Sequence, residues 1–227
     1  MSAVGASFGE RLKKVQDRIA HSRTSISARE IQILAVSKSQ SVEKMQAAYA
    51  QASQKLFGEN YLQEALEKQQ SLLSPDIEWH FIGHLQSNKI KSIVGAFDLI
   101  HSVDRIELIK EIHKRAEQKN LTQKVLIEVN IADETSKSGI APQLLPALLD
   151  QAKAFPRVKI AGLMCMPPLG KNETETRQYF AATRALAEQY KLAKLSMGTS
   201  EDFEWAVAEG ATILRLGTIL FGKRGEL

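Results

Sequence analysis

The chain has 227 residues, of which 44% are hydrophobic and 25% charged, and this is the composition of an ordinary globular protein. Its 30 basic and 26 acidic residues are spread along the chain, so the net charge of +4 gives little support for nucleic-acid binding. Cys165 is the only cysteine, which excludes an internal disulfide, and no Cys/His cluster has the spacing of a structural zinc site.

The N-terminal stretch does not have the pattern of a targeting segment. Its first twenty residues carry Glu10 and Asp17 among the basic side chains and lack the apolar core of a signal peptide. No later stretch reaches the ~18 apolar residues needed to cross a membrane. We therefore predict a cytoplasmic protein in a reducing compartment, monomeric, with no membrane or nucleic-acid partner.

A short apolar run followed by an amphipathic stretch repeats along the chain. The apolar runs cover residues 31–36, 55–58, 79–83, 99–103, 125–131, 158–166, 195–197 and 213–221. Helical spacing of apolar residues marks 42–52, 61–72, 106–119, 143–154, 175–190 and 203–209. An extra helix is predicted before the first run, over residues 8–21. Asp104 and Glu107 predict a capping box where the helix over 106–119 begins.

Strands that alternate with helices favour parallel strands joined by right-handed crossovers, and eight of them in ~200 residues match a closed barrel. A doubly wound open sheet is the alternative. The only Pro/Gly-rich stretch, residues 167–170, has the length of one loop and not of a domain linker. We therefore predict an α/β fold in which residues 1–227 form a single (β/α)8 TIM barrel, with no second domain after it.

Lys38 follows the first apolar run, at the point where a buried strand would open into a loop. Partial burial disfavours the charged ammonium and lowers the pKa of such an amine, by up to ~3–5 units in fully buried cases. More of the side chain is then the free base that condenses with an aldehyde. The alternative is a lysine that merely extends its charged end from a strand end into solvent.

In a (β/α)8 barrel the functional residues gather at the carboxyl ends of the strands, and in this chain those ends are rich in glycine and hydroxyl side chains. Glycine lets a ligand approach the backbone, hydroxyls donate hydrogen bonds, and a helix beginning after a strand presents free N–H groups to an anion. We predict a phosphate pocket at Ser200, Gly217 and Thr218. The alternatives are an N-cap for Ser200 and a tight turn at Gly217 and Thr218.

Arg215 lies inside the apolar run over 213–221, where a guanidinium is costly unless it finds an acceptor. The alternation of a strand places it on the same face as Gly217. We expect Arg215 to point at a ligand or a carboxylate, and a structural ion pair is the alternative.

These residues belong to short segments that occur in a fixed order. The segments are residues 35–38, 57–61, 79–83, 85–89, 129–130, 136–139, 162–164 and 215–218. Together they resemble the pyridoxal phosphate homeostasis proteins, the YggS/PROSC family, from about residue 31 to residue 222. The resemblance implies a barrel like the N-terminal domain of alanine racemase and a role in intracellular vitamin B6 homeostasis and supply, with PLP-dependent apo-enzymes as possible partners.

Carried over residue by residue, the resemblance makes Lys38 the lysine that holds pyridoxal 5′-phosphate (PLP) as a Schiff base. It puts the cofactor phosphate near Ser200, Gly217 and Thr218. Arg215 would face the pyridine nitrogen. Asn60 would bind the cofactor from beside it. Lys89 and Lys137 would stand at the mouth of the pocket, and Met164 would also lie further from the cofactor, all three with less defined roles.

Two departures from the family pattern stand out. Ser39, Gln40 and Ser41 follow Lys38 where the family often has threonine, lysine and proline, so a second lysine beside Lys38 is missing. Thr199 stands next to Ser200 where the family commonly has a methionine. This replacement changes the packing beside the phosphate pocket but leaves Ser200 in place.

Three functions fit the sequence. The first is a PLP-binding homeostasis protein without strong catalysis, because a guanidinium at the pyridine nitrogen disfavours its protonation and no second domain supplies another acid or base. The second is a PLP-dependent enzyme such as an amino-acid racemase. The third is a PLP-independent barrel enzyme that acts on a phosphorylated metabolite, and it would leave Lys38 without a chromophore.

Overall fold

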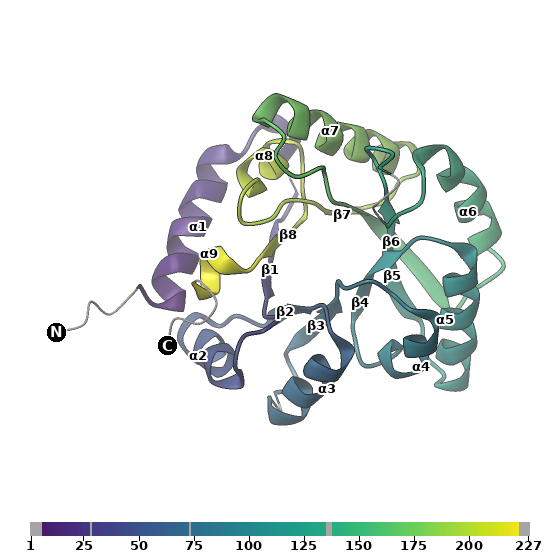
Figure 1. Ribbon diagram of the computed structural model, residues 1–227, viewed down its shortest axis with the longest axis horizontal. Coiled ribbons are helices and arrows are strands. Elements are labelled where there is room, and N and C mark those ends of the chain that lie inside the picture. The colour runs from purple at the N-terminus through teal and green to yellow at the C-terminus, as the bar shows by residue number, and fades with distance from the viewer. Residues whose placement is uncertain (1–5, 28, 73, 135–137, 223–227) are drawn as a thin grey trace.

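A computed structural model describes residues 6–27, 29–72, 74–134 and 138–222. Its strands form a closed barrel in chain order, in which each strand pairs with the next in parallel and β8 pairs with β1 (Figure 1). The strands are β1 Gln32–Val36, β2 Leu56–Glu59, β3 Glu78–Phe81, β4 Leu99–Val103, β5 Gln123–Val129, β6 Val158–Cys165, β7 Lys194–Ser196 and β8 Ile213–Leu216. The predicted (β/α)8 barrel is confirmed, and the open-sheet alternative is wrong.

Helices surround the ring of strands (Figure 1). They are α1 Phe8–Ser22, α2 Val42–Ala52, α3 Leu62–Ser71, α4 Ile90–Ile93, α5 Ile106–Gln118, α6 Leu145–Ala152, α7 Glu173–Gln189, α8 Phe203–Ala208 and α9 Thr218–Phe221. Short 3-10 turns lie at Ser25–Ser27, Ser87–Lys89 and Pro142–Leu144. The predicted extra N-terminal helix is α1, which begins at a capping box between Ser7 and Glu10 and packs beside α2, α8 and α9.

Two apolar cores hold the barrel. The larger core includes the buried face of α1 and the inner faces of the other helices against the strands. The smaller core lies inside the barrel, and its members come from five different strands: Leu34, Leu99, Leu126, Met164 and Ile213. Since side chains alternate along a strand, residues two and four positions after these members face the same interior. The barrel interior is therefore apolar at the level of these five residues. Nearer the carboxyl ends of the strands, the interior positions include polar side chains.

Two local predictions are wrong. The apolar run over residues 213–221 is not one strand, because β8 ends at Leu216 and the chain turns at Gly217 into α9. The capping box at Asp104 does not form, since Arg105 is the N-cap of α5 without a side-chain cap. The Asp104 carboxylate instead accepts a hydrogen bond from Arg105 Nη1 at 2.7 Å, because the neighbouring guanidinium is a stronger partner than a helix amide.

Candidate functional site

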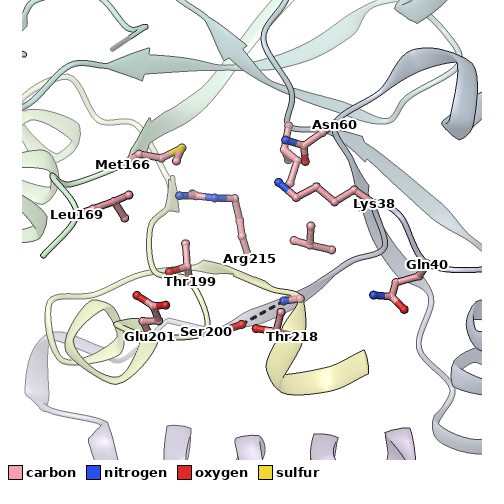
Figure 2. Close-up of a pocket in the computed structure, with 13 residues that line it drawn as sticks. Lys38, Gln40, Asn60, Met166, Leu169, Thr199, Ser200, Glu201, Arg215 and Thr218 are labelled. Atoms are coloured by element: carbon pink, nitrogen blue, oxygen red, sulfur yellow. Dashed lines mark hydrogen bonds between the residues drawn. The ribbon is translucent and has the colours of Figure 1, made fainter. Parts of the chain in front are cut away.

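A cavity of about 440 Å³ lies at the carboxyl ends of the strands. Figure 2 shows the side chains of Lys38 and Arg215 extending into the same space, with Ser200 and Thr218 at its lower edge. The residues that line it are Val36, Lys38, Gln40, Asn60, Ile82, Met166, Leu169, Thr199, Ser200, Glu201, Arg215, Gly217 and Thr218. All six of the residues predicted to bind the cofactor therefore meet in one cavity.

Strand alternation explains why these side chains converge. Lys38 lies four residues after Leu34, and Arg215 lies two residues after Ile213, so both follow members of the interior core on the same strand face. Asn60 follows directly after β2. Its carbonyl oxygen lies only 2.0 Å from where a Cβ on Gly83 would stand, so only glycine permits this close approach of the two strand ends.

The Ser200 hydroxyl lies where the chain leaves β8. Its Oγ accepts hydrogen bonds from the backbone N–H groups of Gly217 and Ile219, each at 3.4 Å (Figure 2 draws the first of them). The interpretation of Ser200 as an N-cap is wrong for α8, whose N-cap is Asp202. A Cβ on Gly217 would make only ordinary van der Waals contact with Val36, at 3.5 Å or more, so the backbone here does not require glycine for steric reasons.

Arg215 is 6% exposed, and its partners are neutral. Its Nη1 donates to the carbonyl oxygen and the hydroxyl of Ser196, both at 2.7 Å, and its Nη2 donates to the carbonyl oxygen of Cys165 at 3.0 Å. No carboxylate pairs with it among the described residues, so the structural ion-pair alternative is wrong there. Burial lowers the pKa of this guanidinium, but arginine stays protonated at working pH. The cavity wall thus contains a buried cation.

A chain of hydrogen bonds crosses the barrel behind Arg215. Because a guanidinium only donates, Ser196 Oγ is an acceptor for Arg215, and it also forms a hydrogen bond with His101 Nδ1 at 3.0 Å. His101 Nε2 in turn forms a hydrogen bond with His80 Nδ1, also at 3.0 Å. Burial lowers the pKa of His80 to about 3 and that of His101 well below its usual value, so both rings are neutral. This chain fixes the Arg215 guanidinium without adding charge.

A second buried network lies beneath Lys38 and holds the residues on both sides of it. Lys68 Nζ donates to the carbonyl oxygen of Ser37 at 2.6 Å, to Glu59 Oε1 at 2.7 Å and to Glu64 Oε1 at 2.6 Å. Ser37 Oγ also donates to Glu59 Oε1 at 2.6 Å.

The same network reaches the residue after Lys38. The Ser39 N–H donates to Glu64 Oε1 at 2.6 Å, and Ser39 has a left-handed backbone with φ of 59°. Non-glycine residues adopt this conformation only when their surroundings stabilise it. The backbone on either side of Lys38 is therefore fixed by one buried ion cluster, formed by Lys68, Glu59 and Glu64.

A second cavity, of about 290 Å³, lies next to the first and shares Asn60, Ile82 and Met166 with it. Its other lining residues are Gly83, His84, Glu128, Val129, Asn130, Ser138 and Met164. Glu128 reaches it from β5, two residues after the interior Leu126. Among the described residues, the Glu128 carboxyl group has no hydrogen bond or ion pair, and burial raises its pKa to about 7.

Two predicted neighbours of the cofactor lie outside the first cavity, and a third lies outside the described residues. Met164 lines the second cavity and not the first. Lys89 is exposed at the end of the 3-10 turn Ser87–Lys89 and lines neither cavity. Lys137 lies outside the described residues. The roles of these three residues stay predictions.

Sequence reasoning missed several residues of the site. It assigned no role to Glu128, although an acidic residue inside the apolar run over 125–131 was the same kind of signal as Arg215. His101 in β4 carried a similar signal. The cavity residues Gln40 and Leu169 lie in loops, where no periodicity marks them, and Met166 was included in an apolar run but given no role.

Comparison with known proteins identifies the family. The family model "Alanine racemase, N-terminal domain" matches residues 11–225. A pyridoxal phosphate homeostasis protein of Aquifex aeolicus is 44% identical over 223 residues, which is 95% of this chain and 97% of the relative. This chain belongs to the pyridoxal phosphate homeostasis protein family. A relative of the same name from Escherichia coli K12 is 38% identical over 226 residues, covering 94% of this chain and 95% of that one.

Solved structures agree with this family. PipY of Synechococcus elongatus, in a structure with PLP bound, is 38% identical and has a TM-score of 0.85, with 95% of this chain and 100% of PipY covered. An alanine racemase of Clostridium difficile is 12% identical, with a TM-score of 0.73, and covers 95% of this chain and 57% of its own, which shows the fold alone. Within the described residues, no helix is long and apolar enough to span a membrane, and no His, Cys, Asp and Glu side chains gather as a metal site.

Proposed function

We propose that this protein binds PLP covalently but reversibly through Lys38 and acts in intracellular PLP homeostasis, without strong catalysis of its own. The observation that carries the proposal is that Lys38, Arg215, Ser200, Gly217 and Thr218 line one cavity. The relatives named as PLP homeostasis proteins, and PipY with PLP bound, support the choice of ligand.

The cavity fits PLP on three grounds. Ser200, Gly217 and Thr218 line one end of the cavity, where hydroxyl groups and backbone N–H donors stand, as a phosphate requires. Arg215 is a buried donor without a carboxylate, suited to a ring nitrogen that accepts a hydrogen bond. Asn60 Oδ1 is buried and has no donor among the described residues, which supports a ligand in this space.

When bound, PLP supplies an aldehyde that reacts with amines and a pyridine ring that can accept electron density. The protein's part is to position and to bind. Lys38 provides the amine for a Schiff base, Ser200 and Thr218 hold the phosphate, and Arg215 donates to the pyridine nitrogen. The proposed recipients are PLP-dependent apo-enzymes in the cytoplasm.

Borohydride reduction tests the attachment residue. We expect the purified protein to absorb as an imine, to lose that absorbance on reduction and to carry one stable label, which peptide mapping finds on Lys38. Lys38→Ala should lose the imine absorbance, while Lys91→Ala, a change at an exposed lysine of α4, should keep it. A label found mainly on Lys89 or Lys137 would overturn the assignment, and a protein without any chromophore would favour a PLP-independent enzyme.

Comparing PLP with pyridoxal, which lacks the phosphate, tests the anion end of the cavity. Ser200→Ala and Thr218→Val should each weaken PLP by about 1.5–3 kcal/mol, the value of one hydrogen bond to a charged group, and should weaken pyridoxal much less. Thr199→Val is the control, since the Thr199 hydroxyl donates to Asp202 at 2.9 Å within its own loop. Equal losses for both ligands, measured by equilibrium titration, would mean that the phosphate lies elsewhere.

A further inference from the structure

The second cavity has a buried acidic group that the proposed PLP site does not use. Glu128 is 9% exposed and lines this cavity, and its carboxyl group has no donor among the described residues. Two other polar side chains of the wall are already engaged. Asn130 exchanges side-chain hydrogen bonds with the backbone of Glu134, and Ser138 Oγ lies 3.2 Å from His84 Nδ1.

The unpaired groups of this cavity are hydrogen-bond acceptors, so they favour a ligand that donates hydrogen bonds. Glu128 is a carboxyl group, and Asn60 Oδ1, in the wall shared by the two cavities, is a second buried acceptor without a donor. A primary ammonium has three N–H donors and no acceptor, so its chemistry matches a wall that offers acceptors without donors. Val129, Met164 and Ile82 supply an apolar wall for an alkyl chain.

We propose that the second cavity is a binding site for a primary ammonium group on an alkyl chain, with Glu128 as its carboxylate partner. The functional role of this site rests on the proposed PLP function. The site would hold an amine next to Lys38, and amines compete with lysine for the aldehyde of PLP. The ammonium belongs either to a small organic amine or to a lysine side chain of another protein.

The charges around Glu128 predict a dependence on pH. Burial is the main reason that its pKa is raised to about 7, Asp104 at the end of β4 raises it further, and Arg215 from β8 opposes the shift. His84 faces the same cavity from the loop after β3. The carboxylate fraction therefore rises about tenfold between pH 6 and pH 8, while an alkylamine stays charged throughout.

The test uses protein whose cofactor has been fixed on Lys38 by borohydride, so that only non-covalent binding remains. n-Butylammonium, titrated by calorimetry or ligand-observed NMR, should bind about tenfold more tightly at pH 8 than at pH 6, and 1-butanol should not bind. Glu128→Gln should weaken n-butylammonium at least tenfold at pH 8 and remove the pH dependence. Glu111→Gln on α5 is the matched control and should change neither.

The outcomes separate the two proposals. Binding of n-butylammonium that Glu128→Gln leaves unchanged, or no binding at all, would overturn the ammonium site. If reduction leaves no cofactor on Lys38, the proposed function fails instead, and the same titration of the untreated protein still decides the ammonium site. N-acetyl-lysine amide distinguishes the sources, because a site for a lysine side chain binds it as well as n-butylammonium, and a site for small amines only does not.

Discussion

Lys68→Met is expected to destabilise the protein by about 3–5 kcal/mol and to lower the fraction of protein that carries PLP on Lys38. Lys68 and Glu59 have side chains that are 5% and 0% exposed, so removing the ammonium leaves a carboxylate in the interior. The same change frees the carbonyl oxygen of Ser37, next to Lys38. Urea unfolding measures the first effect, and borohydride labelling of the folded protein measures the second.

The ion cluster also predicts how the stability lost in Lys68→Met depends on pH. Burial raises the pKa of Glu59, and the hydrogen bonds from Lys68 and Ser37 only partly offset this. An acid whose pKa is raised by folding stabilises the fold below its unfolded pKa and loses that contribution as pH rises through the folded value. Without Lys68, the pKa of Glu59 in the folded protein rises further. The free energy of unfolding lost in Lys68→Met should therefore be larger at pH 8 than at pH 5.

A double variant separates the cluster from a general loss of packing. In Glu59→Gln/Lys68→Met no buried carboxylate remains at position 59, so we expect it to be more stable than Lys68→Met alone. Lys153→Met removes a surface pair with Asp150, whose side chains are 79% and 76% exposed, and should cost less than about 1 kcal/mol. Strictly additive losses in the double variant would contradict the proposed coupling.

The parts of the fold that sequence predicts are those set by periodicity. The alternation of apolar runs and amphipathic stretches was sufficient for the eight-stranded barrel and for α1. It failed at residues 213–221, because an apolar strand and an apolar helix turn have the same composition over so few residues, and Gly217 is where the chain changes direction. The Asp104 capping box failed because a neighbouring guanidinium competed for the carboxylate.

The site was predictable where one residue carried the signal by itself. Lys38 and Arg215 are charged residues at or in apolar runs, and strand alternation brings them to one cavity. The ion cluster beneath Lys38 was not predictable, because a lysine on an amphipathic helix such as α3 is usually exposed, and only the packing of α3 on β2 buries Lys68 against Glu59. Glu128 shows that the same reasoning, applied to every charge in an apolar run, would have found the second cavity.

Wild-type protein is expected to exchange the α-proton of amino acids with solvent deuterium far more slowly than ~1 s⁻¹, the lower end of ordinary enzyme turnover. A protonated pyridine nitrogen makes PLP an effective electron sink, and a carboxylate partner favours that proton. Arg215 is a donor held by Ser196 and Cys165, with neutral histidines behind it, so a ring nitrogen that faces it accepts a hydrogen bond and stays unprotonated.

Arg215→Glu reverses this polarity and should raise the exchange rate per bound cofactor at least tenfold, which corresponds to about 1.4 kcal/mol of barrier. Because a buried carboxylate at this position can also disrupt the fold, Arg215→Gln is compared with it, and circular dichroism and cofactor content normalise both rates. The neutral glutamine should leave the rate near that of the wild type, since it supplies no negative charge to hold the ring proton. Wild-type exchange at ~1 s⁻¹ or faster would contradict the proposed homeostasis function and favour a racemase-like enzyme.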